Sequence, residues 1–583
     1  METLNDFFIN PVHSTHRKYE ALRSLCIDKK TAHEVANKFG YSVYTINAFK
    51  RDLLQMFKQD RLEPEYFFAT HSAGRPIDVA KSDTKNKIIQ LRKHNFSILD
   101  IQTVLHTQGY GVTHDYIFRV LKNDGFARLP KRTSIEKRLI SSETLAAPIS
   151  QTVNWADDNN KRFSSERGLG ILTFLPLLAE LQIEQWVKIA HYPETSELSS
   201  MQMVMSFLSL KLSGNKRYHH DDLWALDRGF GLFSGLNVLP KTTTLSTYSY
   251  RVSRDMNRRF LLAMNKEFLG RGLLKGMMNM DFTIVPHWGD ASILENNWSG
   301  KRNKALKSVL AAICQDPDSG IFSYGNAELK HKEQYDFVFE FVDFWKEQGE
   351  LLKCLIFDSK FTTYQNLEKL DKDGIKFITL RRRSKKLVAA TECLPESNWD
   401  NVIIESGKRK RRVLKVQDSE IELQGINSKF RQIIVTDNGH DNPSFFITND
   451  RERTAAQLIR QYGKCWNVEK GIAEQIEFFH LNSLSSSIVV KVDFDLTMTI
   501  AAHNIYRTIA QDLPGFERET ATSLNTKFFT NGGHFTIQDD QIIVELKKKR
   551  HLPLLVEVLN KYKTKPISWL ENRRLYFKLD TTS

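Results

Sequence analysis

The chain has 583 residues, of which 41% are hydrophobic, a composition that is ordinary for a globular protein of several domains. Its 83 lysines and arginines outnumber 69 aspartates and glutamates, and the formal net charge of +14 favours nucleic acid first and an anionic membrane surface second as partners. No apolar run approaches the roughly 20 residues of a membrane-spanning helix, the acidic start does not resemble a signal peptide, and five scattered cysteines indicate neither a disulfide framework nor a zinc ribbon, so we expect an intracellular protein with reduced thiols.

Residues 1–70 contain a helix-turn-helix pattern. Thr31 can cap a helix over residues 32–39, Gly40 turns the chain, and Ser42 can cap a second helix. The residues of this second helix predicted to contact DNA are Tyr44, Thr45, Asn47 and Lys50.

A second helix-turn-helix unit is predicted for residues 85–130. Its last helix has Ile117, Val120 and Leu121 on the inner face, and the residues predicted to contact DNA on the outer face are His114, Arg119 and Lys122. A basic Gly-Arg-Pro linker, residues 71–84, joins the two units, and its Arg75 could enter a minor groove. Single units of three helices often bind proteins or no ligand, but two in tandem on a basic chain favour sequence-specific DNA binding.

Residues 131–165 are polar and irregular, which is typical of a linker. Residues 166–275 then show long apolar faces at helical spacing, so we expect a helical region. Four arginines in this region could contact a DNA backbone or lie on a solvated helix face: Arg251, Arg254, Arg258 and Arg259.

From residue 276 the pattern changes to strands. Strands are predicted over 276–285, 308–316 and 320–329, followed by a helix over about 333–349, a strand that ends at Asp358, a helix and a strand over 376–381. A meander followed by alternating helices and strands predicts a mixed sheet with helices on its faces, over residues 276–384. A basic, β-rich insertion over 385–447 precedes final helices over 448–512 and a C-terminal region over 513–583, giving a multidomain α+β protein.

Three carboxylates occur in this part of the chain: Asp281 in the first strand, Asp358 at the tip of the fourth, and Glu469 on a later helix. The first and fourth strands of such a sheet tend to lie side by side, so the two aspartates can converge. Three carboxylates held together repel one another unless cations lie between them, and oxygen ligands select Mg²⁺ or Mn²⁺.

Each carboxylate also has a structural interpretation. Asp358 could be a helix N-cap, Asp281 could pair with a nearby base, and Glu469 could be a surface residue of its helix. Glu474 and Glu477 are nearby alternatives to Glu469. Asp290 is interpreted as a turn residue.

Residues 165–510 resemble the DDE insertion-sequence transposases, in the branch with an RNase H-like catalytic domain and a β-strand insertion. The matching stretches are "MDFTIVPHWGD", "LIFDSKFTTYQNLEKLDKDGIKFITLRRRSK" and "FFITNDRERTAAQLIRQYGKCWNVEKGIAEQ". The family motif Y-x2-R-x3-E-x6-K falls on Tyr462, Cys465, Glu469 and Ile476, so tyrosine and glutamate match whereas arginine and lysine do not. Lys464 or Lys470 could replace the lost phosphate contact.

The resemblance implies a DNA transposase that binds the ends of its mobile element and performs cleavage and strand transfer. It assigns catalysis and the binding of two Mg²⁺ ions, for which Mn²⁺ would substitute, to Asp281, Asp358 and Glu469. It further implies double-stranded DNA as partner, a homodimer or higher synaptic assembly, and a nucleoid-associated protein of the prokaryotic cytoplasm. Further residues predicted to contact DNA are Arg381, Arg382, Arg383, Lys408, Arg409, Lys410, Tyr462, Lys464, Trp466 and Lys470.

Two other functions fit the same sequence. One is a catalytically inactive, transposase-derived regulator that binds DNA, which the altered arginine and lysine positions motivate. The other is an RNase H-like nuclease that cuts without joining.

Overall fold

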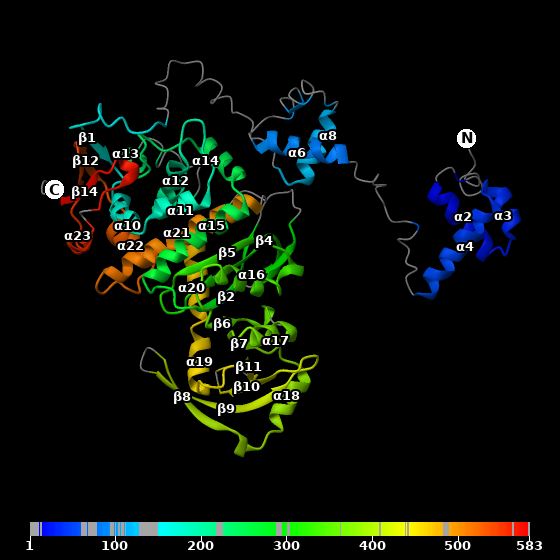
Figure 1. Cartoon of the computed structure of the whole chain (residues 1–583). Coiled ribbons are helices and arrows are strands. Elements are labelled where there is room, and N and C mark those ends of the chain that lie inside the picture. The colour runs from blue at the N-terminus through cyan, green and yellow to red at the C-terminus, as the bar shows by residue number, and fades with distance from the viewer. Residues whose placement is uncertain are drawn as a thin grey trace. The chain divides into compact units, whose positions relative to one another are not determined.

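The structure is a computed structural model (Figure 1). It describes residues 11, 14–59, 67, 79–93, 98, 101, 102, 105, 110, 112–126, 150–216, 224, 227–286, 294–299, 303–361, 363–406, 410–437, 439, 442–481, 489–562 and 565–580. The chain divides into two compact units, residues 1–83 and 84–583. All five cysteines are free thiols, as the sequence predicts.

The first unit contains helices α2 (Ser14–Cys26), α3 (Ala32–Phe39) and α4 (Val43–Lys58). Thr31 and Glu34 form a reciprocal capping box at the start of α3, and Gly40 ends α3 with a φ of 69°, which a glycine adopts without strain. Ser42 caps α4. The predicted bounds of α3 and the predicted start of α4 are therefore confirmed, because caps are local in sequence.

The second unit begins in α6 (Val79–Lys93, whose first residues belong to the first unit), and α8 (His114–Asn123) follows later in the chain. Ile117, Val120 and Leu121 of α8 are buried as predicted, and they form a small core with Ile88 of α6 and Ile101.

Helices occupy most of the described residues between 170 and 270, as expected. The elements are η1 (Gly170–Phe174), α10 (Leu175–Glu180), α11 (Ile183–Ala190), α12 (Ser200–Leu212), α13 (Arg228–Phe233), α14 (Thr242–Tyr248), η3 (Ser249–Arg251) and α15 (Arg254–Gly270).

The arginines around α15 bind within the protein. Arg254 forms an ion pair of 2.9 Å with buried Asp493, whereas Arg258 pairs with Glu347. Arg259 pairs with Asp255, one turn away on the same helix. The interpretation of these arginines as a DNA-facing or freely solvated row is therefore wrong for Arg254, which is a partly buried structural cation.

One large sheet organises the centre of the second unit. Its first strands are β2 (Met277–Pro286), β3 (Asn296–Ser299), β4 (Lys304–Gln315) and β5 (Phe322–Leu329), and β4 pairs antiparallel with each of the other three. β6 (Cys354–Phe357) pairs parallel with β2, and β7 (Lys376–Leu380) pairs parallel with β6. The predicted side-by-side arrangement of the first strand and the strand that ends at Asp358 is confirmed; β3 was not predicted.

Helices cover both faces of this sheet (Figure 1). Gly325 of β5 lies against Ile500 and Leu496 of α21 (Val489–Asp512), and the next residue back, Tyr324, packs on Phe344 of α16 (Phe337–Lys346). Successive residues of a strand point to opposite faces, so α21 and α16 lie on opposite sides of the sheet. α17 (Tyr364–Lys372) connects β6 to β7.

The insertion extends the same sheet. It begins with a helix, α18 (Lys385–Glu392), which the β-rich prediction missed, and continues with β8 (Asp400–Ser406), β9 (Lys410–Glu422), β10 (Lys429–Thr436) and β11 (Ser444–Thr448). These strands form an antiparallel ladder, and β11 pairs with β7. The final helical segment is split into α19 (Ala455–Gly463) and α20 (Trp466–Glu477).

A second sheet joins distant parts of the chain. β1 (Arg162–Ser165) pairs with β12 (Gly533–Ile537), which continues to β13 (Gln541–Leu546) and β14 (Arg574–Leu579). The remaining C-terminal elements are α22 (Ala521–Leu524), a π-helical turn (Asn525–Phe529) and α23 (Leu552–Leu559). The prediction of a linker up to residue 165 is thus wrong at its end, because pairing over such a sequence separation leaves no local pattern.

A substitution at Gly170 tests the packing between the helical region and the C-terminal elements. A Cβ at Gly170 would overlap the backbone carbonyl group of Phe529, so we expect Gly170→Ala to lower the free energy of unfolding by about 1–3 kcal/mol. Gly270 at the exposed end of α15 has no atom within 4 Å of an added Cβ, so Gly270→Ala should be neutral or stabilising by at most about 1 kcal/mol. Urea unfolding measures both, and equal effects would contradict the packing described.

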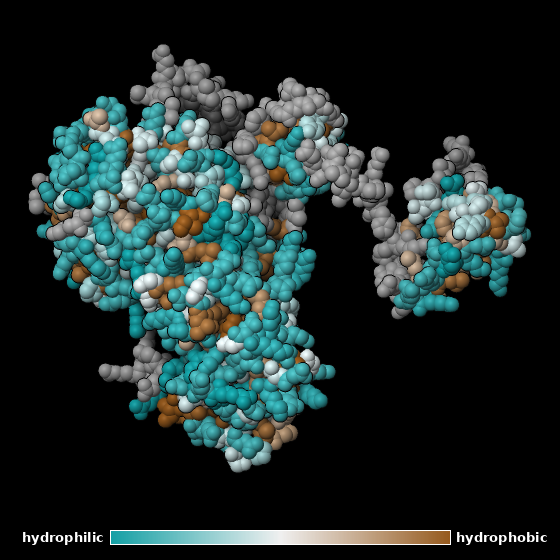
Figure 2. Space-filling view, in the orientation of Figure 1, coloured by the Kyte–Doolittle hydropathy of each residue, from teal (hydrophilic) through white to brown (hydrophobic). Residues whose placement is uncertain are grey.

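Figure 2 shows that hydrophilic residues cover most of the visible surface, with small scattered apolar patches. Within the described residues, no helix is both long enough and apolar enough to cross a membrane.

Candidate active site

Asp281 lies on β2, and Asp358 directly follows the end of the adjacent parallel strand β6. The register pairs Met280 of β2 with Phe357 of β6, and each aspartate is the next residue along its strand. Neighbouring strands are about 4.8 Å apart, so the two carboxylates leave the sheet at the same place. Each accepts a hydrogen bond from the following backbone N–H, at 2.7 Å from Phe282 and 2.6 Å from Ser359.

The junction between α19 and α20 is held against the sheet near the two aspartates by polar contacts. Buried Asn279 of β2 donates a hydrogen bond of 3.0 Å to the carbonyl oxygen of Lys464. The Lys464 ammonium forms an ion pair of 2.6 Å with Asp318, and Asn467 donates to the carbonyl oxygen of Pro317 at 3.3 Å. These contacts tie the junction to β2 and to the β4–β5 turn.

The same contacts position Glu469, which follows the junction in the first turn of α20. The inner face of α20 carries buried Val468 and Gly471, and a Cβ at Gly471 would press on the ring of Phe322 in β5. Glu469 lies beside this buried face and is exposed. α20 therefore holds a carboxylate over the strands that carry the two aspartates.

The three carboxylates interact electrostatically. Burial, together with the negative charges of Glu469 and Asp358, raises the pKa of Asp281 to about 6, although the N–H of Phe282 and the charge of Lys360 oppose the shift. Burial is the largest of these causes. Asp281 is thus a carboxylate whose charge needs a cation nearby.

Tyr462 and Cys465 belong to the same cluster. Burial raises the pKa of the Cys465 thiol to about 12, with contributions from the charges of Asp281, Glu469 and Asp358. Burial also raises the pKa of Tyr462, whose ring packs edge-on against Phe446 at 5.0 Å between centroids. Both side chains are therefore uncharged neighbours of the carboxylates.

The structure decides between most of the alternatives for these residues. Asp358 is not the N-cap of α17, because Thr363 accepts the capping hydrogen bond from Asn366. Glu474 is engaged elsewhere, since it accepts hydrogen bonds from the backbone N–H of Ala521 and pairs with His503 at 3.1 Å. Glu477 is exposed at the end of α20, two turns beyond Glu469, so Glu469 is the glutamate beside the aspartates.

The donor set suits a hard divalent cation. Carboxylate oxygens are the preferred ligands of Mg²⁺ and Mn²⁺, and a cation beside Asp281 would relieve the repulsion that raises its pKa. No three His, Cys, Asp or Glu side chains in the described part of the chain are gathered closely enough to hold an ion as they stand. Asp281, Asp358 and the exposed side chain of Glu469 are the residues that would hold one.

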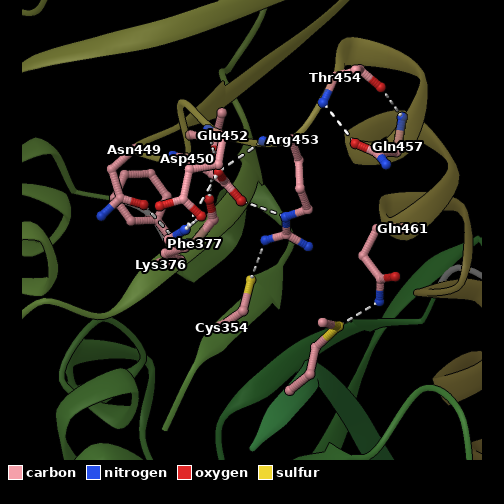
Figure 3. Close-up of polar contacts among 12 residues, drawn as sticks. Cys354, Lys376, Phe377, Asn449, Asp450, Glu452, Arg453, Thr454, Gln457 and Gln461 are labelled. Atoms are coloured by element: carbon pink, nitrogen blue, oxygen red, sulfur yellow. Dashed lines mark hydrogen bonds and ion pairs between the residues drawn. The ribbon is translucent and has the colours of Figure 1, made fainter.

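The amino end of β6, opposite the aspartates, is held by a buried ion pair (Figure 3). Arg453 pairs with fully buried Asp450 and donates to the sulfur of Cys354 at 3.4 Å. Asp450 also lies 3.7 Å from the ammonium of Lys376 in β7. The segment before α19 is therefore fixed to β6 and β7, which sets the direction of the helix that leads to Tyr462.

The other residues predicted to contact DNA are dispersed. Tyr44, Asn47 and Lys50 are exposed on α4, with 82% of Tyr44 accessible, whereas Thr45 hydrogen-bonds Ser42. His114, Arg119 and Lys122 are exposed on α8. Arg75, Lys408, Arg409 and Asp290 lie outside the described residues.

The cations that follow β7 are partly engaged. Arg381 donates to Gln432 at 2.8 Å and Arg382 to the hydroxyl of Tyr335 at 3.3 Å, whereas Arg383 is exposed. Lys410 begins β9, Trp466 begins α20, and Lys470 is exposed beside Glu469. Because Lys464 is paired with Asp318, it is a weak substitute for the missing motif arginine.

Two further residues belong to the site but were not predicted. Asn279 donates a hydrogen bond to the carbonyl oxygen of Lys464 just before α20, and the charge of Lys360 lowers the pKa of Asp281. The position of Lys360, two residues after Asp358, was the available signal. Comparison with known proteins found no matching family model and no matching curated protein.

Proposed function

We propose that the protein is a DNA transposase that binds the ends of its mobile element and catalyses metal-dependent cleavage and strand transfer. The observation that carries the proposal is the juxtaposition of Asp281 and Asp358 at adjacent positions of parallel strands, with Glu469 interacting from α20. Three carboxylates from separate elements that act on one another are typical of a divalent-metal site, and perturbed pKa values favour a functional site.

The architecture supports the same proposal. A three-stranded antiparallel meander extended by two parallel strands, with helices on both faces, is what the RNase H-like interpretation requires. The insertion lies between the strand after Asp358 and the helix that carries Glu469, as in the branch that the sequence resembles. The paired short helices in residues 32–58 support a DNA-binding role for the N-terminal part.

The chemistry assigned to the site is phosphodiester cleavage followed by joining. Two divalent ions, when bound, would activate the attacking oxygen and stabilise the leaving oxygen of an in-line displacement. The rigid strands β2 and β6 hold Asp281 and Asp358 in place, and buried Asn279 holds the helix junction that precedes Glu469. Basic residues around the site would contact the phosphate backbone.

The proposal is tested with DNA that carries the gene and its native flanks. Purified protein and Mg²⁺ should cut at the borders of the element, and Asp358→Ala should bind the same borders without cutting. Tight border binding without cleavage in either Mg²⁺ or Mn²⁺ would contradict the catalytic role and favour the regulator. Cleavage with free 3′-OH ends and no joined products would favour the nuclease.

The two glutamates of α20 should behave differently. Glu469→Gln is expected to abolish border cleavage, because it removes a ligand of the proposed site. Glu474→Gln should leave cleavage measurable but lower the free energy of unfolding by about 1–3 kcal/mol, because its partners His503 and Ala521 lose a charged acceptor. Cleavage assays and urea unfolding separate the two, and loss of cleavage only in Glu474→Gln would contradict the assignment.

A further inference from the structure

The turn that follows β6 is fixed to the strand that carries Asp281. Residues Ser359–Phe361 form a 3₁₀ turn directly after Asp358. The ring of Phe361 is fully buried and stacks on the ring of Phe282, with centroids 3.9 Å apart and planes at 11°. Phe282 is the neighbour of Asp281, so this stack holds the turn and its residue Lys360 beside the aspartates.

Lys360 follows Asp358 by two residues, in the turn that packs on the neighbour of Asp281. Its backbone is held by the buried Phe361, but its own side chain is exposed. Within the described residues no carboxylate forms an ion pair with it, whereas Lys464 is bound to Asp318 and Lys372 to Glu368. Lys360 nevertheless acts on Asp281, whose pKa it lowers. Its ammonium is therefore near the site and available.

At the two positions where the resembled motif has cations, this chain has none. The positions of the motif arginine and lysine are occupied by Cys465 and by Ile476, which packs against the core. A phosphodiester is an anion and the three carboxylates repel it, so positive charge beside them, from bound divalent cations and from a nearby ammonium, favours its close approach. A lysine ammonium binds phosphate oxygens as a compact point charge.

We infer that Lys360 contacts the scissile phosphate of the DNA end and supplies the charge that the missing motif residues would provide. This inference rests on the proposed function. The contact stabilises the negative charge that develops on the phosphoryl oxygens during displacement, and Lys360 exchanges no proton and forms no covalent bond.

The test compares Lys360→Met, which keeps the length of the side chain but removes its charge, with Lys360→Arg. Lys372→Met is the control, because it removes another exposed lysine, at the far end of α17. Single-turnover border cleavage at saturating Mg²⁺ should fall roughly 10²–10³-fold in Lys360→Met and recover substantially in Lys360→Arg. Lys372→Met should cleave like the wild type.

Border binding with Ca²⁺ in place of Mg²⁺ provides a second readout that does not depend on catalysis. The slope of log affinity against log salt should decrease in magnitude by about 1 in Lys360→Met and stay unchanged in Lys372→Met. The inference would be overturned if Lys360→Met cleaved at the wild-type rate at saturating Mg²⁺. It would also be overturned if the only change in Lys360→Met were a lower Mg²⁺ concentration needed for cleavage, because Lys360 would then be a counter-ion that the metal displaces. If the wild type itself does not cleave, the proposed function fails, and an unchanged salt slope would then overturn the phosphate contact separately.

Discussion

Asp281→Asn is expected to abolish DNA cleavage and at the same time to stabilise the metal-free protein. Loss of a metal ligand removes several kcal/mol of transition-state stabilisation, so the rate should fall roughly 10³-fold or more. The stabilisation follows from the pKa of Asp281, which burial and neighbouring negative charges raise from 3.8 to about 6.

The direction of the pH dependence follows from the protons bound. Between about pH 4 and pH 6 the folded protein retains a proton on Asp281 that the unfolded chain has released. The free energy of unfolding of the metal-free wild type therefore falls as the pH rises through this window and stays lower above it. Asparagine removes this loss, which is worth at most about 3 kcal/mol at pH 7.5.

Urea unfolding in the presence of a chelator at pH 4.0 and pH 7.5 measures this effect. The stability advantage of Asp281→Asn over the wild type should be small at pH 4.0 and largest at pH 7.5, and added Mg²⁺ should reduce it. Asp540→Asn, a change at an exposed aspartate outside the site, is the matched control and should alter neither cleavage nor the pH dependence. An advantage that is equal at both pH values would contradict the described electrostatics.

Of the substitutions proposed, Arg453→Met is expected to lower the free energy of unfolding most. Asp450 is fully buried and is paired with Arg453, and the arginine also contacts Cys354 of β6 (Figure 3). Removing one partner of a buried ion pair leaves an uncompensated charge and typically costs about 3–5 kcal/mol. Lys376, 3.7 Å from Asp450, compensates only in part because Glu452 also binds it.

The double variant Asp450→Asn with Arg453→Met is the informative control. It removes both charges, so it should be more stable than Arg453→Met alone. Urea unfolding of both variants decides this. Border cleavage should also fall in the single variant, because the pair fixes the segment that leads through α19 to Glu469. A single variant that is as stable as the double variant would contradict the described role of the ion pair between Asp450 and Arg453.

Locally encoded features of the fold could be predicted from the sequence. The caps at Thr31 and Ser42 and the turn at Gly40 depend on neighbouring residues only, so α3 and α4 were placed correctly. The apolar runs around Asp281 and before Asp358 located β2 and β6, and the order of elements indicated that they are adjacent.

Features that depend on distant partners could not be predicted. β1 is a strand only because β12, more than 350 residues later, pairs with it. The break between α19 and α20 has no proline, and it is stabilised by contacts of Lys464 and Asn467 with the β4–β5 turn and by Asn279 of β2. The proximity of Lys360 to Asp281 depends on the stacking of Phe361 on Phe282, two aromatic residues that an apolar pattern assigns to the core without pairing them.

Metal selectivity of border cleavage in Asp358→Cys tests the central claim most directly. A thiolate is a poor ligand for Mg²⁺ but a good one for softer metals, so a residue that binds the metal changes the metal requirement when it becomes cysteine. We expect Asp358→Cys to be inactive with Mg²⁺ and to recover border cleavage with Mn²⁺ or Cd²⁺, while the wild type cleaves with Mg²⁺. Cleavage by Asp358→Cys with Mg²⁺ at the wild-type rate, or no recovery with either softer metal in a folded variant that still binds the borders, would contradict a metal-binding role for Asp358.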